Sequence, residues 1–353
     1  MLANLFHAWE RRLHGVSKDR VIRPFEWGLD WIGSNGHQPG TPPDRILLDW
    51  ASHAVADSQR FFDTPDTSDY TLTPDVEGAT AAVSFPSAMT TPYPENNTVH
   101  ALYFRSVKSG KGACRAEAAK PRRRAVVVLP QWNAGPDGHI GLCRLLNRFG
   151  MSALRLTLPY HDARRPAEIA RADYIVSANI ARTAQACRQA VMDARRAVAW
   201  LAKQGYDRIG ILGTSLGSCL SLLTAAHEPL IRAQALNHIS PYFADVVWRG
   251  LSTTHVRAAL DGAVDLDRLR EMWLPISPQS YLDRIRDKKT LLVYAKYDLT
   301  FPVDLSRELV GEFQRRRIPH ELAVLPCGHY STGITPFKYL DGFVLARFLD
   351  RNL

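Results

Sequence analysis

Gly213-Thr214-Ser215-Leu216-Gly217 is the stretch of sequence that decides the fold of this chain. The apolar run at residues 208–212 precedes it and is typical of a buried strand, while the small and apolar residues 218–227 favour a packed helix. A G-x-S-x-G pattern between a strand and a helix predicts a sharp turn that presents the serine hydroxyl to solvent. The two glycines are expected because Cβ atoms would collide where the strand and the helix pass closely. The helix N-terminus favours negative charge that develops beside Ser215.

Away from this stretch, apolar runs alternate with amphipathic segments along most of the chain. We predict strands at residues 98–107, 125–129, 152–158, 208–212, 233–239, 290–295 and 321–325, and helices at residues 139–149, 179–204, 304–316 and 336–349. Strands that alternate with helices form βαβ units, whose parallel sheet is covered by helices on both faces. We therefore predict the α/β class, with a mostly parallel central sheet.

Two regions depart from this alternation and set the predicted domain boundaries. Residues 240–287 are mostly helical in pattern and lie between two strands. They predict a helical cap over the carboxyl ends of the strands, where open α/β sheets bind ligands. Residues 1–97 predict a helical extension packed on the core, and its part at residues 63–97 is rich in turn-forming residues. The catalytic core is then predicted to comprise residues 98–239 and 288–353.

Composition places the chain among globular proteins. Its 353 residues are 46% hydrophobic, and no apolar run reaches the roughly 18 residues of a membrane-spanning helix. Residues 1–12 lack the apolar core of a signal peptide and instead predict an amphipathic helix. The cysteines are odd in number and have no metal-type spacing, which predicts reduced thiols and a cytoplasmic protein. They are Cys114, Cys143, Cys187, Cys219 and Cys327.

The chain is basic, with a formal net charge of +9. Basic clusters occur at residues 120–124 and 315–317. A basic surface suits an anionic partner, such as a nucleic acid or a lipid surface. Neither cluster has interleaved aromatic residues or belongs to a recognisable nucleic-acid-binding module. We therefore expect a solvated loop and an exposed helix end, and no nucleic-acid partner.

A serine hydroxyl is a poor nucleophile at neutral pH, so Ser215 needs two partners. A histidine must take its proton, and a carboxylate must orient that histidine. Asp298 follows the predicted strand at residues 290–295 and is the predicted acid. Asp245, which follows the preceding strand, is the alternative because it also lies at the carboxyl edge of the sheet.

The predicted general base is His329, which follows the last predicted strand. Gly328, directly before it, is expected to let this loop turn tightly toward the neighbouring strand ends. The other histidines fit the role less well, and we expect them to be structural or exposed. His238, which precedes the predicted acid, is one of them.

The tetrahedral intermediate needs backbone N–H groups aimed at its oxyanion. Leu216, directly after the serine, is predicted to supply one of them. The loop that follows the strand at residues 125–129 is predicted to supply the other, from Gln131 or Trp132. We favour Trp132, whose indole would also wall the acyl pocket.

Further substrate-binding candidates lie in two other segments. Tyr160 and His161 belong to a polar loop at residues 159–166, which either binds substrate or is held down by Asp–Arg pairs. Trp248 and Trp273 belong to the predicted cap and either line an acyl pocket or only pack the cap onto the body. The chain has no H-E-x-x-H, phosphate-binding-loop or dinucleotide-binding pattern, so neither a metal nor a cofactor is predicted.

Ser215, Asp298 and His329, each on a loop that follows a strand and in that chain order, resemble the α/β-hydrolase superfamily. The resemblance covers residues 98–353 and implies an α/β-hydrolase fold. A looser similarity is to bacterial and mitochondrial abhydrolase-domain esterases. It is carried by Leu129-Pro130, Gly138-His139 and Pro159-Tyr160. The chain has Pro130-Gln131 where the superfamily usually has a His-Gly oxyanion dipeptide, which leaves the second oxyanion donor open.

The superfamily contains esterases, lipases, thioesterases, peptidases and acyltransferases, and the fold does not choose among them. We predict a serine hydrolase that cleaves a small-molecule carboxylic ester through an acyl-enzyme intermediate. A membrane-surface lipid hydrolase of phospholipase type is one alternative, suited to the amphipathic N-terminus and positive charge but less favoured. A serine peptidase or thioesterase and a non-catalytic binding module are the others. The sequence does not identify the acyl and alcohol groups of the substrate or the oligomeric state of the protein.

Overall fold

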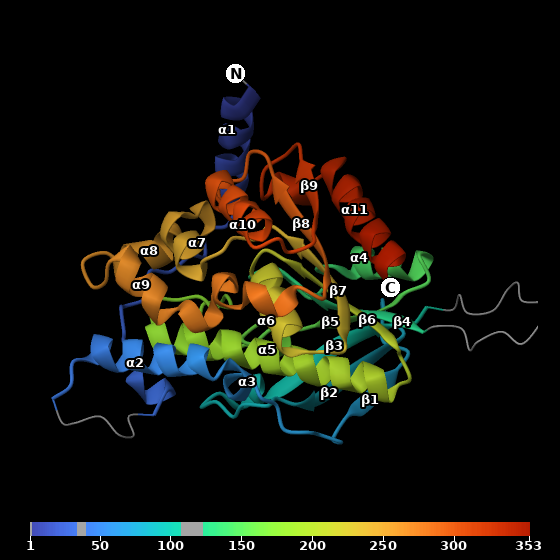
Figure 1. Ribbon diagram of the computed structural model, residues 1–353, viewed down its shortest axis with the longest axis horizontal. Helices are drawn as coiled ribbons and strands as arrows, with labels where there is room; N and C mark the ends of the chain where they lie inside the picture. The colour runs from blue at the N-terminus through green and yellow to red at the C-terminus, as the bar shows by residue number, and fades with distance from the viewer. Residues whose placement is uncertain (1, 34–39, 107–122) are drawn as a thin grey trace, which may run out of the picture.

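The computed structural model describes residues 2–33, 40–106 and 123–353. Its centre is a nine-stranded sheet in the order β1-β2-β3-β5-β4-β6-β7-β8-β9 (Figure 1). Along the order β5-β4-β6-β7-β8-β9 each strand pairs in parallel with the next. The pairs β1-β2, β2-β3 and β3-β5 are antiparallel. The strands are β1 (Thr71–Pro74), β2 (Ala81–Pro86), β3 (Thr98–Phe104), β4 (Arg124–Leu129), β5 (Ser152–Leu156), β6 (Arg208–Thr214), β7 (Ile231–Asn237), β8 (Lys289–Ala295) and β9 (Glu321–Leu325).

Helices cover both faces of this sheet, as the alternation predicts (Figure 1). One face packs against α4 (Ile140–Arg148) and α11 (Phe337–Asn352). The other packs against α5 (Ile180–Lys203), α6 (Leu216–His227) and α10 (Val303–Arg315). The central strands are consequently buried on both sides: Val126 and Val128 of β4 point into one core and Val127 into the other, and none has exposed area. This burial explains the continuous β-branched runs of the sequence.

The N-terminal residues add helices and two strands to this core. The helical elements are α1 (Leu2–His14), η1 (Leu29–Trp31), α2 (Pro43–Ala56), α3 (Ser58–Phe61) and η2 (Pro94–Asn97). The structure differs from the turn-rich prediction for residues 63–97, because β1 and β2 lie there and extend the sheet beyond β3. In β2 alternate residues are buried, but the run is short and ends at Pro86, so its strand pattern is weak in the sequence.

Residues 240–287 lie between β7 and β8 and are mostly helical. They form α7 (Phe243–Arg249), η4 (Leu251–Thr253), α8 (Thr254–Leu260), α9 (Leu266–Met272), η5 (Leu274–Ile276) and η6 (Pro278–Ile285). The two ends of this segment have different neighbours. α7 packs on α8 and η4, whereas η5 and α9 pack against α2, and η6 packs against α6. Among these elements, residues of α7, η4 and the start of η6 line the cavity described below.

Two further features of the described residues concern membrane-spanning helices and cysteines. None of their helices has the length and apolarity needed to cross a membrane. Cys143, Cys187, Cys219 and Cys327 are buried and form no disulfide. Cys114 and residues 120–122 of one basic cluster lie outside the described residues.

Candidate active site

Ser215 lies at the sharp turn between β6 and α6, as the sequence predicts. Its φ of 57° and ψ of −120° form a backbone conformation that residues other than glycine rarely adopt, at a cost of about 1–3 kcal/mol. Hydrogen bonds hold the turn in place. The Ser215 N–H donates to the Asn237 carbonyl at 2.7 Å, and the Ser218 hydroxyl donates to the Ser215 carbonyl at 2.6 Å.

The two glycines of the motif are required by close backbone contacts. A Cβ on Gly213 would lie 2.0 Å from the carbonyl oxygen of Gly217. A Cβ on Gly217 would lie 2.1 Å from the carbonyl oxygen of Leu129. Real Cβ atoms do not approach backbone atoms this closely, so only glycine allows α6 to pack directly on the ends of β6 and β4. The same packing brings the loop after β4 next to the N-terminus of α6.

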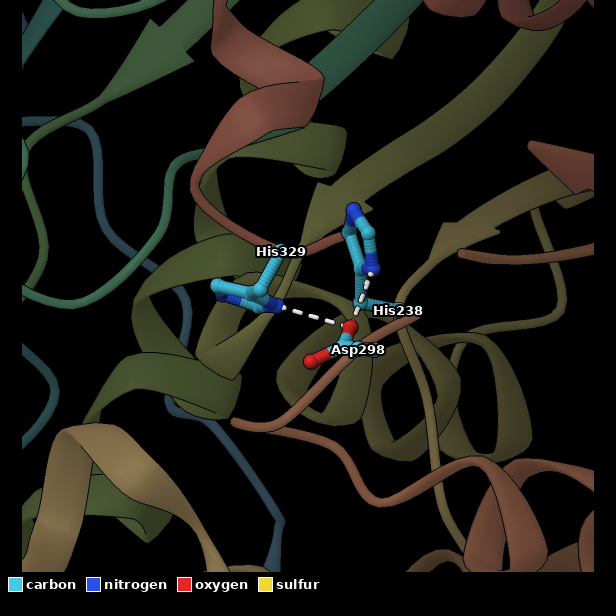
Figure 2. Close-up of side chains that lie close together, drawn as sticks. All are labelled: His238, Asp298 and His329. Carbon is cyan, nitrogen blue, oxygen red and sulfur yellow. Dashed lines mark hydrogen bonds and ion pairs between the residues drawn. The ribbon is translucent and has the colours of Figure 1, made fainter. Parts of the chain in front are cut away.

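Asp298 follows β8, His329 follows β9, and their side chains meet (Figure 2). The Nδ1 atom of His329 lies 3.0 Å from Oδ2 of Asp298 and donates to it, because an ionised carboxylate can only accept. The second carboxylate oxygen, Oδ1, accepts the backbone N–H groups of Thr300 at 2.8 Å and Phe301 at 2.7 Å. These bonds orient the imidazole and leave Nε2 of His329 as the atom that can take a proton.

His238 also binds Asp298, which the sequence does not predict. Its Nδ1 donates to the same oxygen, Oδ2, at 2.9 Å, so one carboxylate joins two imidazoles whose ring centroids are 4.5 Å apart (Figure 2). His238 is buried and directly follows β7, the strand beside β8. That position at the carboxyl edge of the sheet is the signal that identifies it. Its φ of 58° re-aims the side chain toward Asp298, and the motifs contain nothing that indicates such a turn.

The buried charges of this group shift its pKa values in opposite directions. Burial raises the pKa of Asp298, but the charge of His329 and the hydrogen bonds from both histidines outweigh burial and hold this pKa well below its usual range. Burial lowers the pKa of His329, but the charge and hydrogen bond of Asp298 and the charge of Glu10 outweigh it and raise this pKa above 6.5. Burial and the charge of His329 lower the pKa of His238, which is therefore neutral at pH 7.

The structure separates the two candidate acids. Asp298 contacts His329, whereas Asp245 lies on α7 and forms a two-bond ion pair with Arg270 of α9, at 2.6 Å and 2.8 Å. Asp245 is 1% exposed, so its oxygens are fully engaged within the helical segment. Its place in the sequence resembles that of Asp298, but α7 begins directly before it and directs it away from the sheet edge.

Ser215 and His329 line the same cavity, which has a volume of about 1670 Å³. The two described side chains form no hydrogen bond with each other, and Oγ of Ser215 and Nε2 of His329 are both without a partner among the described residues. Contacts of this kind are often long in structures without substrate and shorten in the substrate complex. The structure thus brings the predicted base and the predicted acid into contact and places Ser215 on the wall of the same cavity.

The backbone N–H groups predicted to bind an oxyanion are free among the described residues. Leu216 is the first residue of α6, so its N–H has no partner within the helix. Gln131 and Trp132 likewise have backbone N–H groups with no hydrogen-bond partner in the part of the chain that the structure describes. All three residues line the cavity.

The loop that carries Gln131 and Trp132 is fixed by His161. Nε2 of His161 accepts the N–H of Asn133 at 2.9 Å, and its Nδ1 donates to the carbonyl of Pro159 at 2.9 Å. Burial lowers the pKa of His161 to about 4, which keeps the ring neutral and able to accept. His161 therefore positions the loop as well as lining the cavity. The indole of Trp132 also lines it, and its Nε1 donates to the Ala172 carbonyl at 2.8 Å.

The remaining substrate-binding candidates divide into two groups. Tyr160 is buried and lines the cavity. Trp248 and Trp273 do not line it, which corrects their predicted role as acyl-pocket walls. Trp273 is fully buried and its Nε1 donates to the carbonyl of Ile180, while Trp248 packs against the guanidinium of Arg257. Within the predicted cap, the lining residues are instead Phe243, Val246, Val247, Ser252, Thr253 and Pro278, with Ser240 just ahead of α7.

His238, Asp298 and His329 are also residue types that bind metals, and their ligand atoms lie within 4.8 Å of one another. Direct hydrogen bonds of 2.9 Å and 3.0 Å already account for this grouping. Each imidazole uses its Nδ1 in such a bond, so a metal ion here would have to replace both Nδ1 protons. The arrangement therefore fits proton transfer through His329 better than metal binding.

Comparisons with known proteins find the same architecture. No family model and no curated protein sequence matches the chain. Among solved structures, acetyl xylan esterase from Paenibacillus sp. R4 is similar at a TM-score of 0.60 and 13% identity, covering 92% of this chain and 98% of that chain. Acetyl xylan esterase 1 from Thermoanaerobacterium sp. JW/SL YS485 has a TM-score of 0.57 at 15% identity, covering 92% and 99%. Acylaminoacyl peptidase from Pyrococcus horikoshii has a TM-score of 0.57 at 14% identity.

The coverage differs between these two kinds of neighbour. The match to the peptidase covers 80% of this chain but only 42% of the peptidase, so this chain spans less than half of that protein. At such low identity the comparisons establish architecture. The mixed sheet, its strand order, the helices on both faces and these neighbours together show that the chain has the α/β-hydrolase fold.

Proposed function

We propose that this protein is a serine hydrolase that cleaves a carboxylic ester through an acyl-enzyme intermediate. The observation that carries the proposal is the Asp298–His329 hydrogen bond at the wall of the cavity that also receives Ser215. A strained serine, a histidine with a free Nε2 and a buried carboxylate are the three groups that nucleophilic acyl transfer needs. The fold supports the proposal because it is the fold of the esterase and peptidase neighbours.

The reaction follows from the roles of these atoms. Nε2 of His329 takes the hydroxyl proton of Ser215 as Oγ attacks the ester carbonyl, and Asp298 stabilises the imidazolium that forms. The N–H of Leu216 and the N–H of Trp132 or Gln131 bind the oxyanion. The imidazolium then protonates the leaving alkoxide, which departs as the alcohol. Water, deprotonated by the same histidine, hydrolyses the acyl-serine and regenerates the hydroxyl.

An ester is favoured over a peptide by the extent of the structural similarity. The two acetyl xylan esterases are matched over 98% and 99% of their length, whereas the peptidase is matched over 42%. A membrane-surface lipid hydrolase is the second candidate. It is favoured by α1, on which Leu2 is 58% and Leu5 63% exposed at a helix that projects from the body (Figure 1). Co-sedimentation with anionic phospholipid vesicles, with and without Leu2→Ser and Leu5→Ser, distinguishes the two.

The proposed nucleophile is tested with a fluorophosphonate probe and a series of 4-nitrophenyl esters. We expect labelling at Ser215, located by peptide mass spectrometry, and hydrolysis that Ser215→Ala lowers by about 10⁴-fold or more. Ser221→Ala is the matched control, because Ser221 lies on the same helix and its hydroxyl has no hydrogen-bond partner among the described residues. Labelling of another serine that persists in Ser215→Ala contradicts the proposal.

A further inference from the structure

Glu10, on helix α1, is a buried carboxylate that the proposed mechanism does not use. Its side chain has no exposed area, although glutamate is almost never fully buried unless it is paired. Among the described residues no lysine or arginine forms an ion pair with it. Burial of an unpaired charge is costly, so strong hydrogen bonds must compensate.

Those hydrogen bonds come from the loop that carries the proposed base. Oε2 of Glu10 accepts the N–H of Tyr330 at 2.8 Å, and Oε1 accepts the N–H of Ser331 at 2.9 Å. These are the two residues directly after His329. On the other side, a Cβ on Gly328 would lie 2.3 Å from Cδ of Glu10. The carboxylate thus contacts the backbone immediately before and after the histidine.

This contact changes the interpretation of Gly328. The sequence predicts that this glycine allows a tight turn, but its φ is not in the positive range that favours glycine. A larger residue would instead have to displace the Glu10 side chain, because its Cβ would occupy the space of the carboxylate. Gly328 therefore leaves the space that the carboxylate of Glu10 occupies, although the two residues are far apart in the sequence.

Helix α1 also contacts the loop that carries the acid. The ring of Phe6 stacks on that of Tyr297, with centroids 4.5 Å apart and planes inclined by 10°. Tyr297 directly precedes Asp298, and its N–H donates to the carbonyl of Cys327 at 2.9 Å. One helix near the N-terminus thus holds both loops of the Asp298–His329 pair.

We propose that Glu10 is a positioning residue, through which helix α1 holds the loop of His329 so that Nε2 is aimed at Ser215. This inference rests on the proposed hydrolase function and adds a requirement for α1 to it. A carboxylate that accepts two consecutive N–H groups fixes the direction of that backbone, and the histidine side chain departs from the residue directly before them. Without Glu10 these two N–H groups would be buried and unpaired, and the loop would rearrange to satisfy them.

The charge of Glu10 should also affect the pKa of His329, an effect that is not expected if Glu10 only holds α1 on the protein. Among the described residues, the titratable groups in contact with His329 are Asp298, His238 and Tyr330, whereas Glu10 contacts the backbone on either side of it. Burial lowers the pKa of His329, and the charges of Asp298 and Glu10 raise it. Loss of the Glu10 charge alone should therefore lower this pKa and shift the acid limb of the pH–rate profile to lower pH.

The test compares Glu10→Gln with wild type in the full chain, using a 4-nitrophenyl ester. We expect kcat to fall about 10-fold to 100-fold, as for loss of a hydrogen bond to a charged group, with little change in KM. The acid limb should move to lower pH. Glu10→Asp keeps the charge but shortens the side chain, so it should leave the acid limb in place and recover part of kcat. Arg11→Gln is the control, because Arg11 is an exposed charge on the same helix.

The outcomes separate this inference from the function on which it rests. If wild type is not labelled at Ser215, the hydrolase proposal fails. If wild type is labelled and Glu10→Gln has the wild-type kcat and pH profile, with only a lower melting temperature, Glu10 is an anchor and this inference is wrong. Should Glu10→Gln not fold, Glu10→Asp decides, because an unchanged kcat in that variant also overturns the inference.

Discussion

Asp298 receives four hydrogen bonds from the described residues, as many as the lone pairs of a carboxylate accept. Thr300 and Phe301 donate to one oxygen, and His238 and His329 donate to the other. The carboxylate is held on every side before substrate arrives, so little reorganisation is needed when His329 becomes charged. This arrangement requires full burial of a charge, and the depressed pKa of Asp298 shows that its partners outweigh the cost of that burial.

His238→Gln is expected to lower kcat about 10-fold, far less than His329→Ala. Loss of its hydrogen bond leaves Oδ2 of Asp298 freer to rotate, so the imidazole of His329 is less firmly oriented, and a hydrogen bond to a charged group contributes about 1.5–3 kcal/mol. The measurement is kcat on a 4-nitrophenyl ester. His227→Gln is the matched control, since His227 is also buried and neutral but ends α6 away from the cavity. Equal losses in the two variants would make the effect one of stability.

The raised pKa of His329 predicts the direction of the pH dependence. The base must be neutral to accept a proton, so kcat/KM should rise with pH through a value above 6.5. The free energy of unfolding should change with pH in the opposite direction. Because the pKa of His329 is higher in the folded than in the unfolded protein, the group stabilises the fold fully below pH 6.5, and this contribution is lost as pH rises through the pKa of the folded state. Rate profiles and urea unfolding between about pH 5 and pH 9 measure both. A rate that falls over this range contradicts the assignment of His329.

At the scale of elements, the sequence predicts what depends on local pattern. The strands β4, β6 and β8 are continuous apolar runs, and the helix after Asn179 begins where its side chain caps the N–H of Arg182. Features that depend on distant partners are not predictable in this way. Glu10 and His329 are 319 residues apart in the chain, and no motif connects them. The same reason applies to Trp248 and Trp273 of the predicted cap, which do not line the cavity. Aromatic content does not indicate which face of a segment contacts the cavity.

The helical segment between β7 and β8 is expected to determine substrate preference through α7 rather than through its tryptophans. Phe243 lines the cavity, so Phe243→Leu should shift the preferred acyl length. Trp273→Phe should lower the free energy of unfolding by about 1–3 kcal/mol, because it leaves a void and removes the hydrogen bond from the indole to the Ile180 carbonyl, with no shift in preference. Relative kcat/KM over acyl chains of two to twelve carbons measures the preference. A shift in Trp273→Phe but none in Phe243→Leu reverses these assignments.

At the scale of the whole molecule, the charge that lines the cavity has the same sign as the formal net charge of +9 of the chain. The cavity is lined by more cationic side chains than carboxylates. The cations are Arg20, Arg144, Arg148, Arg165, Arg171 and Lys338, and the carboxylates are Asp19, Asp162 and Asp341. Burial raises the pKa of Asp341 to about 7, which further reduces the negative charge at neutral pH. A cavity whose lining carries a net positive charge concentrates anionic ligands.

This charge predicts a preference for esters whose acyl chain carries an anion. The mono-4-nitrophenyl ester of glutaric acid should have a higher kcat/KM than 4-nitrophenyl pentanoate, which has the same chain length without the carboxylate. The advantage should fall as salt rises from about 0.01 M to 1 M, because the Debye length shrinks from about 30 Å to 3 Å. Lys338→Gln should reduce it, because Lys338 is exposed and lines the cavity. Lys289→Gln should not, because Lys289 begins β8 and so lies at the opposite edge of the sheet from the cavity. A ratio of the two esters that is unaffected by salt and by Lys338→Gln would show that the cationic lining serves stability or solubility instead.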